Sequence, residues 1–416
     1  MNSQAPVRGS ELVVGGSRLG FGPQWLARAF SGGIHKILDR LDAGITCGTI
    51  DGVLPDGTTR RVGGRGASSE AGTTAAVTVH DWRALLRLAT GGSVGWYQAW
   101  EAGEWDSPDP VALFALFMEN GATLGNLGRA HGPWRFAATV LHWLRRNTRA
   151  GSERNIHAHY DLGNDFYSLW LDPTMSYSSA RFYAGADLEA AQRCKIASVA
   201  DRVAGAGSVL EIGCGWGSLA GELAARGSQV TAISLSDEQL TWARQHQQPG
   251  IDFRKADYRD TTGQFDAIVS VEMVEAVGRA FWPDFFDCIS RCLKPGGRAA
   301  IQYIAMRDDL FDAYARSADF IQTYVFPGGM LIRESEFRAL AAERGLSWED
   351  QVNFGPDYAE TLRIWRENFD RIVAEGRLPP GFDQRFVGLW RFYLMYCEGG
   401  FRGGGIDVAQ VTVVKR

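Results

Sequence analysis

Two glutamates, Glu272 and Glu275, follow an apolar run, FDAIVSV, at the point where that run would end as a β-strand. No lysine or arginine comes after them until Arg279. Carboxylates of this kind are often solvated surface groups. They also suit a site that must manage positive charge. The pair therefore marks a candidate site whose chemistry involves a cation.

A glycine-rich turn supplies a second candidate site. The segment VLEIGCGWG places Gly213, Gly215 and Gly217 directly after a strand and before a helix, where glycines permit a tight turn and close approach of a ligand. The spacing matches neither the phosphate-binding GxxxxGKS/T loop nor the GxGxxG of dinucleotide-binding proteins. Glu211, just before the glycines, fits a cofactor with an amine and a sulfonium better than one with a pyrophosphate. A purely structural turn is the alternative.

Two later segments favour a cofactor site at this turn. In ADYRD, after the third expected strand, Asp257 could accept a hydrogen bond from an adenine amino group and Tyr258 could cover the ring. The segment LKPGGR then precedes a late strand. The order of glycine turn, acid after the third strand and Pro-Gly-Gly resembles that of class I S-adenosylmethionine-dependent methyltransferases.

The elements that must position these residues alternate between strands and helices from about residue 155 onward. Such alternation predicts a parallel sheet covered by helices. With the resemblance above, we expect an α/β class I methyltransferase fold, with a Rossmann-like seven-stranded sheet and helical lid insertions near 305–332 and 355–398. The clearest expected strands are 208–213, 229–235, 251–257 and 265–271, and the clearest helices between them are 218–227 and 236–248.

Residues 1 to about 150 differ in pattern and predict a smaller α+β domain. Short strands surround a Pro-Asp-Gly turn at 55–57, and a Gly/Ser/Thr-rich loop follows. Next come a strand, a helix stopped by Gly91 and Gly92, and two aromatic-rich helical stretches. A basic linker, RRNTRAGSERN, leads onward, so the expected domains are 1–150 and 151–416.

Composition restricts the class of protein. The net charge of −5 gives no support for a nucleic-acid partner, and no run of about 18 apolar residues predicts a membrane span. The N-terminus lacks the basic start and long apolar stretch of a secretory signal. The 6 cysteines are scattered, and Cys288 and Cys292 have no second metal-like pair. We therefore expect buried thiols in a reducing cytoplasm and no metal site.

Four longer motifs identify a narrower resemblance. They are HAHYDLGNDFYSLWLDPTMSYSSARF, EMVEAVG, DFIQTYVFPGGMLI and MYCEGGFRGGGIDVAQV, in that order. Together they resemble the cyclopropane-fatty-acyl-phospholipid synthase family, which includes the mycolic acid cyclopropane synthases and related lipid C-methyltransferases. The resemblance covers about residues 155–416, and the first 150 residues are similar to the family's less regular N-terminal domain.

The resemblance implies both the reaction and the cofactor contacts. Members transfer a methyl group from S-adenosylmethionine to a cis double bond of an acyl chain in an unsaturated phospholipid, forming a cyclopropane ring. Tyr177 and Ser178 would hold the methionyl end of the cofactor, whose body would lie against the glycine turn. The expected ribose and adenine contacts are Ser234, Leu235, Gln239, Asp257 and Tyr258.

In the same family a bicarbonate ion is bound beside the substrate. By likeness Glu275 would help to bind it, Tyr324 of QTYVFPGG would lie at the same site, and Cys397 of YCEGGF would lie near the pocket. The sequence departs from the best-known members at two positions. Ser179 stands where they have a cysteine, and Gln302 stands where they have a histidine. Glutamine can donate a hydrogen bond but cannot titrate.

Methyl transfer to an alkene leaves a carbocation, which must be kept from water. Aromatic faces could stabilise it by about 0.5–2 kcal/mol each. The final proton acceptor is either bicarbonate, held by Glu275, Tyr324 and Gln302, or Glu275 itself. Glu272 belongs to this site or caps the following helix. The aromatic candidates, each of which could instead be core, are Tyr177, Phe182, Tyr303, Phe320 and Tyr324.

A phospholipid substrate implies a cytoplasmic enzyme that binds the inner membrane surface peripherally. Segment 134–149, with Arg145 and Arg146 near its end, is either a surface-binding helix or an interdomain helix with solvated arginines. A homodimer stays open. Two other functions also stay open: a lipid C-methyltransferase that leaves a methyl or methylene branch, and a lipid-binding protein that has lost turnover.

Overall fold

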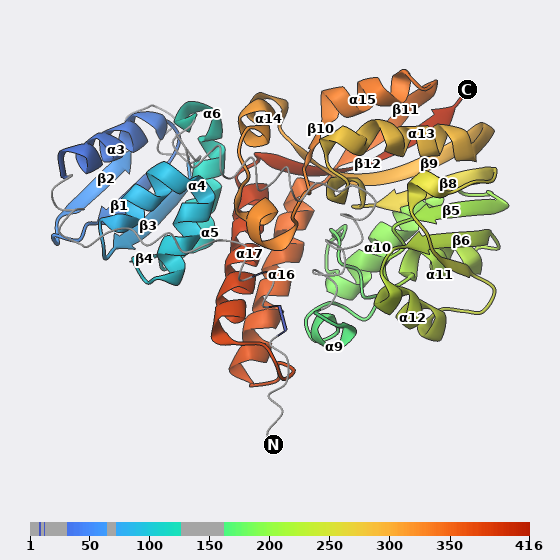
Figure 1. The fold of residues 1–416 in the computed structure, drawn as a ribbon, viewed down its shortest axis with the longest axis horizontal. Coiled ribbons are helices and arrows are strands. Elements are labelled where there is room, and N and C mark those ends of the chain that lie inside the picture. The colour runs from blue at the N-terminus through green and yellow to red at the C-terminus, as the bar shows by residue number, and fades with distance from the viewer. Residues whose placement is uncertain (1–7, 10–11, 13–30, 65–71, 126–161) are drawn as a thin grey trace.

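The computed structural model describes residues 8–9, 12, 31–64, 72–125 and 162–416. Figure 1 shows a smaller N-terminal unit and a larger C-terminal unit, with two long helices, α16 (Gly355–Ala374) and α17 (Gln384–Arg402), between them. Segment 134–149, the basic linker and the expected boundary at residue 150 lie outside the described residues.

The larger unit is built on a mostly parallel sheet with strand order β7-β6-β5-β8-β9-β12-β11, which confirms the expected fold class. A short extra strand, β10, pairs with β9, and β12 runs antiparallel to both of its neighbours. The strands are β5 (Ser208–Ile212), β6 (Gln229–Ser234), β7 (Asp252–Lys255), β8 (Phe265–Val271), β9 (Leu293–Met306), β10 (Ile332–Arg333), β11 (Leu346–Asn353) and β12 (Ile406–Lys415).

Helices cover both faces of this sheet. Consecutive strand residues point to opposite faces, so Val209 packs with the helices of one face and Leu210 with those of the other. The first face carries α10 (Leu188–Asp201), α11 (Ser218–Ala225) and α12 (Asp237–His246); the second carries α13 (Trp282–Cys292) and α15 (Glu334–Ala342).

The Pro-Gly-Gly segment forms a bulge inside β9 instead of a separate turn before it. The β8–β9 ladder pairs Phe265 with Leu293 and then Ala267 with Arg298, so the intervening residues leave the regular register. Gly296 has φ +76°, a conformation that glycine tolerates. The bulge preserves the strand and lets its carboxyl end reach the site.

The helical insertions lie where they were expected. Between β9 and β10 the chain forms α14 (Asp308–Ala315) and a π-helical turn at Ile321–Val325. Before β12 it forms α16 and α17, which pack against each other. These insertions lie on the side of the sheet that faces the N-terminal unit (Figure 1).

The N-terminal unit is α+β, with a sheet of order β2-β1-β3-β4. Its Pro-Asp-Gly turn joins β1 and β2 as an antiparallel hairpin, in which the Asp56 carboxylate accepts the Thr58 N–H at 3.0 Å. The elements are α3 (Ser31–Gly44), β1 (Thr49–Val53), β2 (Thr59–Gly63), β3 (Thr74–Val79), α4 (Arg83–Glu101), β4 (Trp105–Asp106), α5 (Pro110–Glu119) and α6 (Gly121–Leu124).

The prediction that Gly91 and Gly92 stop a helix is confirmed in part: one helical stretch ends there and a second follows directly. Helix α4 runs from Arg83 to Glu101 and is kinked at Gly92, which has φ +59° and ψ −139°. Glycine can leave helical geometry for one residue because it has no Cβ, and helical backbone resumes directly afterwards. The kink matters because Gly91, Gly92 and Ser93 line a cavity described below.

The N-terminal unit packs closely on α17. A Cβ on Gly399 would lie 2.4 Å from Phe114 Cβ, and one on Gly403 would lie 2.3 Å from the Ala115 carbonyl oxygen. Glycines at these two positions, one turn apart, let α5 approach the α17 backbone. One buried hydrophobic cluster accordingly spans both units.

In the described parts of the chain, no helix combines the length and apolar character that a bilayer span requires. The expectation of buried thiols holds for Cys214, Cys288 and Cys292, whereas Cys47, Cys194 and Cys397 are half-buried.

Candidate active site

The glycine turn between β5 and α11 has a backbone that suits glycine. Gly213, Gly215 and Gly217 have φ of +82°, +52° and +87°. A Cβ on Gly213 would lie 2.6 Å from Met273 Cγ, whereas a Cβ on Gly215 would meet no atom within 4 Å. The turn therefore leaves open space at Gly215, which a purely structural turn does not require.

A cavity of about 210 Å³, which we call the glycine-turn cavity, opens at this turn. It lies at the carboxyl ends of parallel strands, where α/β proteins bind their ligands. The fold brings together at its walls every residue expected to contact a cofactor: Tyr177, Ser178, Glu211, Gly213, Gly215, Gly217, Ser234, Leu235, Gln239, Asp257 and Tyr258.

Two buried groups of opposite charge line one end of this cavity. Glu211 is 3% exposed and Lys195 is 4% exposed, and Lys195 Nζ donates to Ser178 Oγ at 2.7 Å. Burial raises the pKa of Glu211 to about 8 and lowers the pKa of Lys195 to about 8. Within the described chain, Glu211 Oε2 has no hydrogen-bond partner. A ligand with both an ammonium and a carboxylate would therefore suit this end.

Asp257 and Tyr258 form another part of the wall of the glycine-turn cavity. Arg259 donates to both Asp257 oxygens, at 2.8 Å from Nε and 2.5 Å from Nη2, so the Asp257 carboxylate is held in a half-buried ion pair. The Tyr258 ring packs edge-on against Phe285, and burial raises the pKa of its hydroxyl. These contacts fix the orientation of both side chains and leave a flat ring available as a wall.

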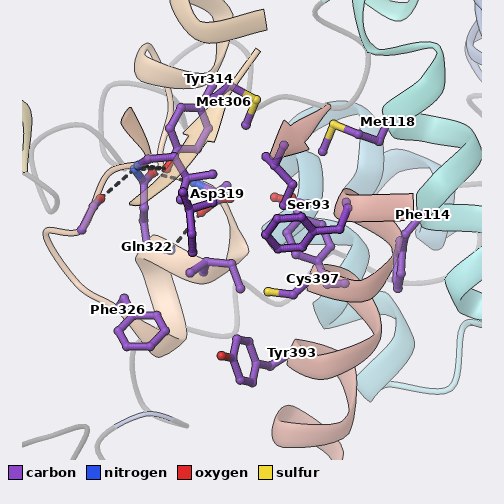
Figure 2. Close-up of a pocket in the computed structure, with 18 of the residues that line it drawn as sticks. Ser93, Phe114, Met118, Met306, Tyr314, Asp319, Gln322, Phe326, Tyr393 and Cys397 are labelled. Atoms are coloured by element: carbon purple, nitrogen blue, oxygen red, sulfur yellow. Dashed lines mark hydrogen bonds between the residues drawn. The ribbon is translucent and has the colours of Figure 1, made fainter. Parts of the chain in front are cut away.

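A second cavity, of about 340 Å³, lies between the C-terminal unit, α17 and the N-terminal helices; we call it the apolar cavity. Figure 2 shows Phe114 and Met118 from the N-terminal helices on one side, Tyr314 and Gln322 on the other, and Cys397 nearby. Most of its lining is aromatic or aliphatic, which suits a hydrocarbon ligand.

The two cavities share part of their walls. Tyr177, Glu272, Ala276, Phe326 and Gly329 line both of them. A reactive group at the end of a ligand in the glycine-turn cavity could therefore meet a hydrocarbon chain at this junction. The carboxylate pair singled out by sequence lies here, because Glu275 also lines the apolar cavity.

Glu272 is tied down by three hydrogen-bond donors. Its Oε1 accepts the Ser179 backbone N–H at 2.9 Å and Gln302 Nε2 at 2.7 Å, and its Oε2 accepts the Tyr358 hydroxyl at 2.7 Å. The short 3-10 helix that follows has no side-chain cap. The interpretation of Glu272 as a helix cap was therefore wrong.

Glu275 has a poorer environment for charge. Its Oε1 accepts the Ile304 N–H at 2.5 Å, and its Oε2 is buried without a partner among the described residues. Burial, together with the charge of Glu272, raises the pKa of Glu275 to about 8. At neutral pH Glu275 is thus mostly protonated. Burial also raises the pKa of Glu272, but its three hydrogen-bond donors oppose that effect.

The other residues expected at the catalytic centre are divided between two places. Ser179 and Gln302 lie beside Glu272, and Cys397 lines the apolar cavity, where burial raises the pKa of its thiol and keeps it neutral. Tyr324 lines neither cavity. Its hydroxyl accepts Gln98 Nε2 at 3.3 Å, and its ring packs on α4. The structure therefore does not bring Tyr324 to the carboxylates.

Of the aromatic residues expected near a cation, Tyr177 alone lines these two cavities in the described chain. Phe320 packs in the α4–α17 core, and the Tyr303 hydroxyl donates to Glu334 on the far face of the sheet. Phe182 also lies outside both cavities, where its N–H bonds Asp357.

Sequence reasoning missed Lys195 and Tyr358. Lys195 lies on the same face of α10 as buried Ala191, Ile196 and Val199. A lysine on an apolar helix face could have been recognised in the sequence as a candidate buried cation. Tyr358 lies at the start of α16, far along the chain from Glu272, and nothing local in the sequence connects the two.

The raised pKa of Glu275 predicts a pH-dependent stability. Between the unfolded value of 4.5 and the folded value of about 8, the folded state keeps a proton that the unfolded state has lost. The free energy of unfolding should therefore fall as pH rises through this window, by at most about 1.4 kcal/mol for each pH unit. Glu275→Gln should flatten this slope, measured by urea unfolding from pH 5 to pH 9; an unchanged slope would contradict the assignment.

Fold and site together define a class I S-adenosylmethionine-dependent methyltransferase. The solved structure of cyclopropane synthase MmaA2 from Mycobacterium tuberculosis covers 63% of this chain and 98% of that chain, with a TM-score of 0.58 and 28% identity. The structure of mycolic acid cyclopropane synthase CmaA1, complexed with SAH and CTAB, gives the same TM-score of 0.58 at 26% identity.

Residues 147–411 match the Mycolic acid cyclopropane synthetase family, and the chain belongs to this family. It is 38% identical over 357 residues to the tuberculostearic acid methyltransferase UfaA1 of Mycobacterium tuberculosis, covering 79% of this chain and 80% of that protein. It is 32% identical to the cyclopropane-fatty-acyl-phospholipid synthase of Escherichia coli K12, covering 78% and 84%. The chain is therefore a lipid-modifying methyltransferase, as the motifs predicted.

Proposed function

We propose that this enzyme transfers a methyl group from S-adenosylmethionine to a cis double bond in the acyl chain of a membrane phospholipid. The observation that carries the proposal is the junction, where Glu272, Tyr177 and Phe326 line both a polar, glycine-rich cavity and an apolar one. Reaction at the shared wall needs no large movement of either ligand.

The residues of the glycine-turn cavity fit the cofactor. Glu211 would pair with its ammonium, Lys195 with its carboxylate, and Asp257 with its adenine amino group, while Gly215 leaves room for its body. When bound, S-adenosylmethionine supplies an electrophilic methyl group. The chain's contribution is to orient that group toward the junction, and orientation of this kind can supply several kcal/mol, about 7 or more in favourable cases.

The walls of the junction suit a transient carbocation on the acyl chain. Tyr177, Phe326, Tyr358 and Tyr393 present aromatic faces or edges to the apolar cavity and offer no strong nucleophile. The Tyr177 and Tyr393 hydroxyls are hydrogen-bonded to each other at 2.7 Å, which keeps both oxygens engaged. Cation–π attraction of about 0.5–2 kcal/mol per ring would favour the cation over its capture by water.

A membrane lipid accounts for the apolar cavity better than a free polar substrate. The cavity continues among the N-terminal helices, where Leu41, Leu88, Trp96 and Leu124 line it. A phospholipid acyl chain would have to enter from a bilayer, so the enzyme would work on the inner membrane surface.

Two products are compatible with this site. Loss of a proton from the added methyl group, with formation of the third bond of the ring, gives a cyclopropane. This product is our first expectation. Proton loss after a hydride shift gives a methylene branch, which the 38% identity to a tuberculostearic acid methyltransferase favours as the second candidate.

Mass spectrometry of lipids from a host expressing the chain tests the proposal. We expect acyl chains heavier by one CH2 unit, absent when an empty vector replaces the gene. Resistance to mild hydrogenation identifies a ring, and uptake of hydrogen identifies a methylene branch. Lipids without the added CH2 unit, from a host that makes the folded protein and cis-unsaturated lipids, would overturn the proposed function.

The N-terminal wall predicts control of acyl length. Leu88 of α4 lines the apolar cavity and is 6% exposed, so Leu88→Trp should shorten the space for the chain. We expect turnover of a long acyl chain to fall about tenfold relative to one two carbons shorter. Leu86→Trp, on the same helix but outside the cavity, is the matched control. Equal loss for both acyl lengths would contradict a role in measuring length.

A further inference from the structure

Two of the residues expected beside bicarbonate, Ser179 and Gln302, are already bonded to a protein carboxylate. The Ser179 N–H and the Gln302 amide both donate to Glu272, and the Ile304 N–H donates to Glu275. Tyr324, the expected hydroxyl donor, packs against α4, and Tyr358 donates to Glu272 instead. The residues present therefore fit a bound bicarbonate ion poorly: of the expected set, Glu275 Oε2 alone is left without a partner in the described chain, and the other members are engaged.

The Glu272 carboxylate accepts hydrogen bonds from two of the groups expected beside that anion, and its backbone conformation is unusual. Glu272 has φ +47°, a left-handed conformation that is unusual for a residue with a Cβ. Its N–H donates to the Gln302 carbonyl oxygen at 2.8 Å, which anchors the residue at the end of β8. Strain of this kind persists where the surrounding structure enforces it, and it concentrates at functional sites.

A chain of hydrogen bonds orients Gln302 as a donor. Gln410 Nε2 donates to Gln302 Oε1 at 3.0 Å, and Ser198 Oγ donates to Gln410 Oε1 at 2.7 Å. With its oxygen occupied, Gln302 must present its NH2 group to Glu272. A neutral donor is what an internal carboxylate needs, and this accounts for a glutamine where a histidine was expected.

The surroundings of the Glu272 carboxylate and its position between the two cavities both suit a catalytic base. Burial raises the pKa of both glutamates, but Glu272 has three donors that oppose this effect and Glu275 has one, so the environment of Glu272 is the more favourable of the two for a carboxylate. Lys195 adds a favourable charge to the same environment. Glu272 also lines both cavities, which places its carboxylate where the acyl chain would receive the methyl group.

We propose that Glu272 is the built-in base of the reaction and replaces bicarbonate; the proposal rests on the function proposed above. Methyl transfer leaves a carbocation on one former alkene carbon of the acyl chain, and the added methyl group is on the neighbouring carbon. The Glu272 carboxylate removes a proton from that methyl carbon, and the C–H electron pair forms the third ring bond. If a hydride has first shifted between the two former alkene carbons, the same pair forms the double bond of a methylene branch. The proton remains on Glu272 until product release exposes it to water.

The first test is bicarbonate dependence of the intact enzyme. We expect turnover of cis-unsaturated phospholipid vesicles to be the same, within about twofold, in carbon dioxide-depleted buffer and in buffer with added bicarbonate. ¹³C NMR with labelled bicarbonate should show no bound resonance. Turnover that collapses on depletion and returns with bicarbonate would overturn the role of Glu272 while leaving the proposed function intact. Absence of any modified lipid under both conditions would instead overturn the proposed function and, with it, the role of Glu272.

The second test is substitution with chemical rescue. Glu272→Gln should lower turnover by about 100-fold or more, since a general base contributes roughly 10²–10⁴, with the affinity for S-adenosylhomocysteine unchanged within about threefold. Glu272→Gly removes the side chain from a φ that glycine accepts, so it should fold, bind labelled bicarbonate and regain at least tenfold activity when bicarbonate is added. Glu334→Gln, on the far face of the sheet, is the matched control. Full activity of Glu272→Gln, or a folded Glu272→Gly that bicarbonate does not rescue, would reject the proposal.

Discussion

Replacing Glu211 by glutamine will weaken binding of S-adenosylhomocysteine by about 100-fold. Glu211 is 3% exposed, its Oε2 has no partner in the described chain, and burial raises its pKa to about 8, so the ammonium of a bound ligand would favour its ionised form and pair with it. Removing one partner of a buried charge pair costs about 2–5 kcal/mol. Glutamine keeps the shape and one acceptor but loses the charge, so the loss should lie toward the lower end of that range.

Isothermal titration of the purified protein measures this effect directly. Glu222→Gln, on the exposed surface of α11, is the control: Glu222 pairs with Arg226 at 2.7 Å, and surface pairs contribute at most about 1 kcal/mol. We expect the control to bind like the unmodified protein. Tight binding by Glu211→Gln would mean that the ammonium of the ligand does not lie at Glu211.

Filling the apolar cavity from α17 should have a comparably large effect on turnover. Cys397 lines the cavity beside Tyr393 and Tyr396, and Cys397→Trp would place an indole where the acyl chain is expected. We expect product formation to fall by more than about 100-fold, since misplacement of a reacting group by about 1 Å already has an effect of that size. Cofactor affinity should not change, because Cys397 does not line the glycine-turn cavity.

Lipid mass spectrometry measures the loss of product formation, and titration with S-adenosylhomocysteine measures whether cofactor affinity is unchanged. Overpacking of a buried site costs about 1–3 kcal/mol, so thermal unfolding must show that the variant is folded. Cys194→Trp introduces the same side chain on α10, outside both cavities, and should retain activity. A folded Cys397→Trp with normal turnover would show that the substrate does not use this cavity.

Local sequence determined the sheet and the cofactor side of the site. Strand and helix periods placed each expected element between 208 and 271 within two residues of its observed ends. The tight turn could be predicted from its glycines because the positive φ angles of such a turn favour that residue type. The cofactor contacts implied by the family resemblance all line one cavity, and those at strand ends do so because parallel strands bring their carboxyl ends to one edge.

The Pro-Gly-Gly bulge and the Gly92 kink show what local sequence leaves undecided. Glycine and proline signal a departure from regular geometry, but a bulge, a kink and a stop all satisfy that signal. In β9 the ladder with the neighbouring strand continues on both sides of the bulge, and in α4 a second helical stretch follows the first directly after Gly92.

The sequence by itself thus determined which fold forms, which edge of the sheet carries the site and that two carboxylates lie there. Only the tertiary structure decided what those carboxylates do. The hydroxyl that meets Glu272 comes from Tyr358 and not from Tyr324, and the orientation of Gln302 depends on Gln410. Periodicity and turn chemistry depend on residues a few positions apart, so a short stretch of sequence is enough to predict them. Hydrogen-bond partners 86 and 108 positions apart are set by how the helices and strands pack, which no local pattern encodes.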